Sequence, residues 1–127
     1  MNAVAFAVAL ALGPIRDVRV DHVPCRVSYR SALRPRDVDE RARIHVETRD
    51  PSAIGRLVRA IAAARPVPDA SPADYRYAIR LRDRRGRVRT MYLDAFGTRG
   101  EIDGAAVRFG SDAIKRVLIA LWHQMSD

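Results

Sequence analysis

Along much of the chain, apolar and polar residues alternate with a period of two, which is the pattern of half-buried β-strands. The clearest stretch is 75–95, and it predicts a hairpin around a turn at 83–86. Before the turn, the apolar positions on one face are Tyr75, Tyr77, Ile79 and Leu81. The register of this hairpin can be predicted from which face is buried.

A left-handed Gly86 would make the turn type I with a G1 bulge, which puts Asp83 opposite Arg87. A two-residue turn would shift the partner strand by one residue and bring polar side chains against the apolar face, so we expect the bulged turn. The predicted pairs are Ile79–Met91, Tyr77–Leu93 and Tyr75–Ala95 on the apolar face, and Arg76–Asp94 and Ala78–Tyr92 on the other.

Shorter alternating segments predict further strands at 15–23, 26–30 and 43–49, and a last short strand carries Val107 and Phe109 inward. Asp103-Gly104 is a hairpin signal before it. The mixed-charge stretch 31–42 and the proline-rich stretch 66–74 are expected to be loops.

Two segments have the three-to-four-residue period of a helix. The first begins with Asp50 as N-cap and Pro51 at the first helical position, and Pro66 ends it by excluding Arg65 from helical geometry. The second begins after Ser111 and runs toward the C-terminus. Their predicted buried stripes are Ile54, Leu57, Val58 and Ile61 in the first, and Ile114, Val117, Leu118, Leu121 and Trp122 in the second.

Hairpin-linked strands followed by helices predict an α+β fold, with an antiparallel sheet of about five strands. Both helices would cover one face of the sheet and leave the other face open to water. A chain of 127 residues is the length of one domain, so we expect a single domain over 14–127 behind an apolar segment at 1–13.

The segment 1–13 has larger apolar residues separated by alanine, and three interpretations stay open. It resembles the apolar core of an export signal with small-x-small cleavage sites, but it lacks a basic region before that core. The second interpretation, which is less favoured than the export signal, is a buried strand within the fold. Because its apolar run is half the length that spans a bilayer, a membrane anchor is the least supported interpretation.

The chain has 23 Lys and Arg against 15 Asp and Glu, a net charge of +8. Lys115 is the only lysine, so 22 of the basic residues are arginine. This bias, with abundant alanine, is typical of a GC-rich bacterial genome and weakens the inference from basic charge to nucleic-acid binding. The resulting field still favours acidic proteins, anionic surfaces and polyanions.

The most distinctive candidate site is the arginine-rich side of the predicted hairpin. Its residues are Arg76, Arg80 and Arg82 with Tyr92 on the face away from the core, and Arg84, Arg85 and Arg87 at the turn. Guanidinium groups beside an aromatic ring are typical of single-stranded nucleic-acid binding. A solvated arginine face that prevents edge-to-edge association explains the same residues.

Other chemistry is weakly indicated. His22 and Cys25 could contribute two metal ligands or a thiol–histidine pair, but no further ligands follow at zinc-site spacing. The acidic residues are interspersed with arginine or flank turns, so they predict no acid–base pair. We therefore expect no cofactor, no metal and no enzymatic activity.

Together these patterns predict a small non-catalytic bacterial protein, periplasmic or secreted, with a cytoplasmic location as the alternative. Its arginine-rich face would contact an acidic protein or an anionic envelope component, and nucleic acid is the alternative ligand. No transmembrane span is expected, and the sequence leaves the oligomeric state open.

Overall fold

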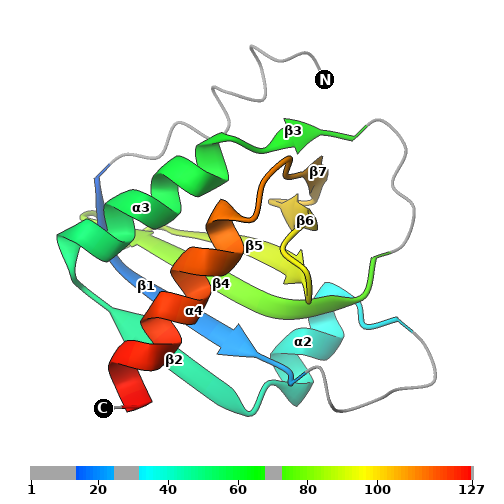
Figure 1. The fold of residues 1–127 in the computed structure, drawn as a ribbon, viewed down its shortest axis with the longest axis horizontal. Helices are drawn as coiled ribbons and strands as arrows, with labels where there is room; N and C mark the ends of the chain where they lie inside the picture. The colour runs from blue at the N-terminus through cyan, green and yellow to red at the C-terminus, as the bar shows by residue number, and fades with distance from the viewer. Residues whose placement is uncertain (1–13, 25–31, 68–72, 127) are drawn as a thin grey trace.

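The computed structural model describes residues 14–24, 32–67 and 73–126, which form an α+β fold with a seven-stranded antiparallel sheet and three helices (Figure 1). The predicted fold class is confirmed, but the sheet is larger than the five strands expected. The strands are β1 (Ile15–His22), β2 (Ile44–Thr48), β3 (Arg65–Pro66), β4 (Tyr75–Asp83), β5 (Val88–Asp94), β6 (Arg99–Ile102) and β7 (Ala105–Arg108). The helices are α2 (Pro35–Arg41), α3 (Pro51–Ala62) and α4 (Ala113–Ser126).

The strands follow the order β2-β1-β4-β5-β6-β7-β3 across the sheet, and every neighbouring pair is antiparallel. The central hairpin β4–β5 therefore has β1 and β2 on one side and the shorter strands on the other. The predicted segment 1–13, the predicted strand at 26–30 and Cys25 lie outside the described residues, so export stays a prediction.

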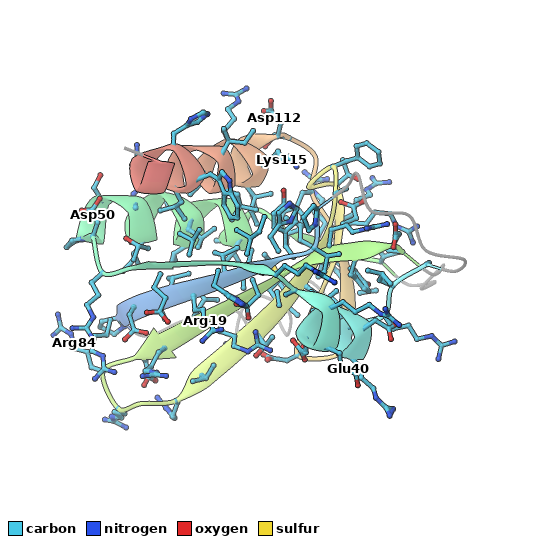
Figure 2. All side chains as sticks on the ribbon, turned by 90° about the horizontal axis from the view of Figure 1, so that it is seen from below. Arg19, Glu40, Asp50, Arg84, Asp112 and Lys115 are labelled. Carbon is cyan, nitrogen blue, oxygen red and sulfur yellow. The ribbon has the colours of Figure 1, made fainter. Side chains whose placement is uncertain are left out.

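The main core lies between one face of the sheet and the two longer helices, α3 and α4 (Figure 2). Alternate residues of β1, β4 and β5 point toward these helices, as the period of two predicts. The most deeply buried large side chains of this layer are Val18, Leu57, Ile61, Ile79, Met91, Leu93, Val107 and Ile114. The expectation that both predicted helices cover the same face is confirmed.

Both predicted helix starts are found. The Asp50 side chain accepts hydrogen bonds from the backbone N–H groups of Ser52 and Ala53, and Pro51 takes the first helical position of α3. Before α4, the Ser111 hydroxyl accepts a hydrogen bond from the backbone N–H of Ala113. These bonds satisfy backbone N–H groups of the first helical turn, which have no hydrogen-bond partner within the helix.

The hairpin turn has the predicted geometry. Gly86 has φ 82°, its N–H donates to the Asp83 carbonyl, and the Asp83 N–H donates to the Arg87 carbonyl. The pairs Ile79–Met91, Tyr77–Leu93 and Ala78–Tyr92 form in the predicted register. At the far end the prediction is wrong, because a register shift between Tyr75 and Tyr77 pairs Tyr75 with Asp94 instead of Ala95.

The stretch 31–42 also differs from its prediction as a loop, because it contains the helix α2. The Asp37 carboxylate accepts a hydrogen bond from the Arg34 N–H and so closes the start of this helix. Val38 is its one buried residue, and it packs in a second cluster on the face opposite α3 and α4. The cluster consists of Val23, Leu33, Val38, Tyr75 and Ala78, with Tyr92 packed against it.

None of the helices in the described part of the chain combines the length and the hydrophobicity that crossing a bilayer requires. The longest of them, α4, has 14 residues.

Gly100 lies on β6 beside β5, and a Cβ atom there would stand 2.7 Å from the Tyr92 carbonyl oxygen. We expect Gly100→Ala to lower the free energy of unfolding by about 1–3 kcal/mol, the usual cost of overpacking. Gly110→Ala is the matched control, because no atom lies within 4 Å of the added methyl group. Urea denaturation of both variants measures the effect, and equal stabilities would contradict the close approach.

Candidate functional site

The sheet face opposite α3 and α4 carries charged side chains in rows that run across the strands. In one row, Arg19 on β1 lies between Glu47 on β2 and Arg80 on β4. In the next row, Asp21 lies between His45 and Ala78, and Ala78 in turn pairs with Tyr92. In a third row, Asp17 lies beside Arg82. We call this surface, with its three rows, the charged face.

Asp21 is the centre of the charged face, and only 8% of its side chain is exposed. Its carboxylate accepts hydrogen bonds from Arg19 Nε at 2.9 Å and Arg80 Nη1 at 2.7 Å, and from His45 Nδ1. Burial by itself would raise the pKa of Asp21, but the hydrogen bonds from His45 and Arg19 outweigh burial and hold the pKa below its ordinary value.

A second carboxylate, Asp39 of α2, ties this helix to the charged face. It accepts hydrogen bonds from Arg80 Nη2 and from the Tyr92 hydroxyl, the latter at 2.8 Å. Burial, followed by the hydrogen bond and charge of Asp39, raises the pKa of Tyr92 to about 12. For Arg80, burial favours the neutral form, but the bond to Asp39 prevails and the pKa of Arg80 rises. Arg80 is therefore a fixed cation between two carboxylates.

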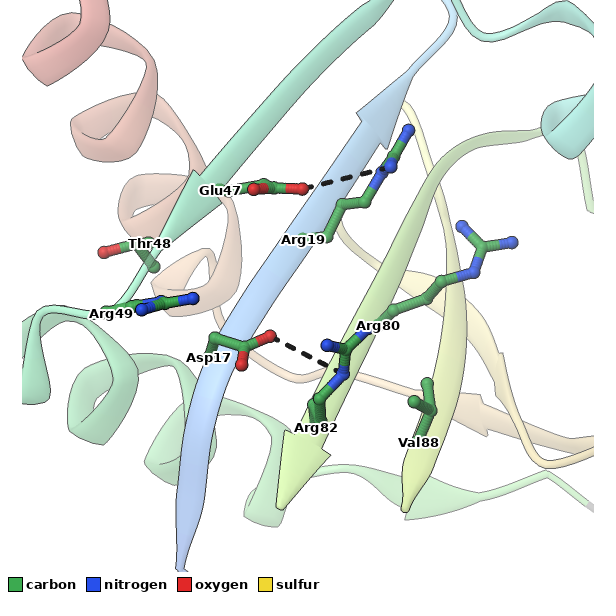
Figure 3. A pocket seen from close by; sticks show the side chains of 8 residues that line it. All are labelled: Asp17, Arg19, Glu47, Thr48, Arg49, Arg80, Arg82 and Val88. Atoms are coloured by element: carbon green, nitrogen blue, oxygen red, sulfur yellow. Dashed lines mark ion pairs between the residues drawn. The ribbon is translucent and has the colours of Figure 1, made fainter. Parts of the chain in front are cut away.

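Beside this network the charged face contains an open depression of about 480 Å³ (Figure 3). Four guanidinium groups border it, and they come from β1, from the segment after β2 and from β4. The lining residues are Asp17, Arg19, Glu47, Thr48, Arg49, Arg80, Arg82 and Val88. We call it the arginine depression.

The four arginines of the depression are not equally neutralised. Arg19 and Arg80 hold Asp21, whereas Arg82 comes no closer than 3.9 Å to Asp17. Among the described residues, the Arg49 side chain has no hydrogen bond or ion pair. Arg49 and Arg82 are therefore the two cations of the depression that can bind a further anion with the least rearrangement.

The predicted site residues separate into three groups. Arg80, Arg82 and Tyr92 share the charged face, as predicted. Arg84, Arg85 and Arg87 lie at or beside the exposed hairpin turn, and only Arg87 is tied down there, by Asp83 at 2.9 Å. Figure 2 shows Arg84 at this end of the sheet.

The expectation that Arg76 is exposed to water is wrong. Arg76 lies at the register shift between Tyr75 and Tyr77, and only 8% of its side chain is exposed. The guanidinium donates to the Asp74 carboxylate at 3.0 and 3.1 Å and to the Pro24 carbonyl at 3.3 Å. A bulge interrupts strict alternation, and Tyr75 accordingly leaves the predicted apolar face and packs in the second cluster with Val38 and Ala78.

Sequence reasoning missed several members of the site, namely Asp17, Arg19, Asp21, His45, Glu47 and Arg49. The alternation in β1 and β2 does place most of them away from the core, but it does not reveal which strands are neighbours. The pairing of β1 with both β2 and β4 is what brings these residues beside Arg80 and Arg82.

A second, more apolar groove of about 210 Å³ lies on the opposite side of the sheet, near the C-terminal half of α4. Its lining residues are His22, Ile44, Tyr77, Leu118, Ile119, Trp122 and His123. The His22 ring stacks on Tyr77 with centroids 4.2 Å apart, and its Nδ1 lies 3.2 Å from the Arg76 carbonyl oxygen. Burial lowers the pKa of His22. We call this groove the apolar groove.

Within the described residues, no group of three or more His, Cys, Asp or Glu side chains is placed to hold a metal ion. No protein-family model, curated protein or solved structure matches this chain at a significant level.

Asp21→Asn tests the central carboxylate. It should lower the free energy of unfolding at pH 7 by about 1–3 kcal/mol, because charged hydrogen bonds to a buried group are weakened. Since folding lowers the pKa of Asp21, its contribution is full above the ordinary carboxyl pKa and disappears as pH falls through the folded-state value. The stability difference from the parent should therefore shrink below about pH 4.

Asp112→Asn is the control for this measurement, because it removes an exposed ion pair with Arg116. Its effect should stay within about 0.5 kcal/mol. Urea unfolding over a pH series gives both curves, and a difference for Asp21→Asn that grows toward acid pH would contradict the assigned role.

Proposed function

We propose that this chain is a non-catalytic binding protein whose arginine depression takes carboxylate groups of an acidic partner protein. The observation that carries the proposal is the convergence of four guanidinium groups on one open depression, where Arg82 has only a long ion pair with Asp17, at 3.9 Å. Arginine's planar fork of donors matches a carboxylate, and it stays charged at every physiological pH.

The position of Tyr92 favours a protein ligand over a nucleic acid. Tyr92, the aromatic residue predicted to stack on bases, packs against the cluster beneath α2 and donates its hydroxyl hydrogen to Asp39. Nucleic-acid stacking needs an exposed ring face, which this arrangement restricts.

A binding role also suits the protonation chemistry of the charged face. Asp21, its most buried carboxylate, already accepts bonds from two arginines and a histidine, and its pKa lies below the ordinary value. A general acid or base needs a pKa near the working pH. This carboxylate is instead suited to hold guanidinium groups in fixed positions.

The double variant Arg49→Gln plus Arg82→Gln tests the proposal. We expect its affinity for a fluorescent deca-glutamate peptide to fall about tenfold, because each exposed charge contact contributes about 0.7 kcal/mol. The matched control is Arg56→Gln plus Arg59→Gln, which removes the same charge from exposed positions of α3 on the other side of the molecule. Fluorescence anisotropy at low and physiological salt measures both.

Equal losses in the two double variants would show that only net charge matters, and would contradict a site at the depression. Single-stranded DNA and vesicles containing anionic phospholipid are titrated in parallel. Tighter binding of either, with the same dependence on Arg49 and Arg82, would reassign the depression to that ligand. A steep salt slope for DNA would identify phosphate contacts.

A further inference from the structure

The two edges of the sheet differ in how they are protected from pairing with another chain. β3 is two residues long and contains Pro66, which lacks an N–H group. β2 is five residues long, pairs with β1 without a register shift, and contains neither proline nor lysine or arginine. Among the described residues no strand pairs with the outer side of β2. Soluble proteins usually block such an edge.

The two depressions lie at opposite ends and on opposite faces of this edge strand. Ile44, the first residue of β2, lines the apolar groove on the helix-covered face. Glu47 and Thr48, at the other end of the strand, and Arg49, directly after it, line the arginine depression. The five residue steps from Ile44 to Arg49 span about 17 Å in extended chain. The strand therefore connects an apolar groove to a cationic depression.

The apolar groove is open to a ligand where it reaches the edge strand. Ile119 of α4 lines it and is 45% exposed, which is high for a large apolar side chain. α4 packs against β2 on this side, so Ile44 and Ile119 belong to one continuous apolar surface. The groove, with a volume of about 210 Å³, has room for an aliphatic side chain.

We propose that β2 is the docking strand for an extended acidic segment of a partner protein, which adds to the sheet beside it. The inference rests on the proposed function, and it specifies the conformation of the partner and its spacing of residues. In an added strand, successive side chains point to opposite faces. One aliphatic side chain opposite Ile44 enters the apolar groove, and one carboxylate opposite Arg49 enters the arginine depression.

The spacing follows from the register. Ile44 and Arg49 are five positions apart, so the aliphatic and acidic residues of the partner must also be five apart. An odd spacing puts these two side chains on opposite faces of the added strand, whereas an even spacing puts them on the same face. Net charge favours an acidic partner over a second copy of this chain. Two copies would repel each other, because each has a net charge of +8.

Two labelled peptides of identical composition test the spacing. One is Glu-Thr-Thr-Thr-Thr-Leu-Thr-Thr-Thr-Thr-Glu, in which leucine is five positions from either glutamate, so that both strand directions are sampled. The other moves leucine by one position, so that both spacings become even. We expect the first peptide to bind at least fivefold more tightly in fluorescence anisotropy. Hydrogen exchange of the amides of residues 44–48 should slow with the first peptide only.

Two protein variants make the test specific to the apolar groove. Ile119→Asp should reduce the affinity for the odd-spaced peptide at least fivefold and leave deca-glutamate binding unchanged. Phe96→Asp is the control, because Phe96 is 77% exposed and is not part of the groove, so both affinities should be unchanged.

The results separate failure of this inference from failure of the proposed function. Equal affinities for the two peptides would overturn the strand addition, while deca-glutamate binding that still depends on Arg49 would leave the proposed function standing. Analytical ultracentrifugation provides the last comparison. A dimer that protects residues 44–48 and is displaced by neither peptide would assign the edge to a second copy and overturn the inference.

Discussion

The charged face depends on one buried negative charge, the carboxylate of Asp21. It lies at the junction of three strands and receives hydrogen bonds from side chains on each of them: Arg19, His45 and Arg80. Removing a charge from water is costly unless partners compensate for it. Here two of the partners, His45 and Arg80, come from neighbouring strands, so their contacts form only when β1 has β2 on one side and β4 on the other. Asp21 thus ties the charged face to the order of the strands.

Arg80 extends this dependence to the helix α2. Its guanidinium bridges Asp21 beneath it and Asp39 on the helix. Because Val38, the neighbour of Asp39, is the one buried residue of α2, the helix is held by a small apolar contact together with these polar ones. The same bridge leaves Arg80 with little capacity for an outside ligand. Arg49 and Arg82, which have weaker internal partners, keep that capacity.

Features that depend on local sequence could be predicted. The Asp50 cap, the left-handed Gly86 and the pairing of Ile79 with Met91 follow from residues close together in the chain. Features that depend on contacts between residues far apart in the chain could not be predicted. The bulge beside Tyr75 buries Arg76 against Asp74 and Pro24, and α2 has too few apolar residues for a helical period to stand out. Likewise, Arg19 and Arg49 join the site only through strand pairing, which alternation alone does not specify.

The single lysine has an unusual position in this arginine-rich chain. Lys115 Nζ donates to the Tyr77 hydroxyl at 2.9 Å and to the Ala95 carbonyl, so it joins α4 to the central hairpin. Its ammonium group also lies 5.0 Å from the centre of the Tyr77 ring. Acylation of this amine, or cleavage of the chain after it, requires these bonds to open first. Reagents that modify lysine side chains therefore report on the opening of these two bonds, with no competing lysine elsewhere in the sequence.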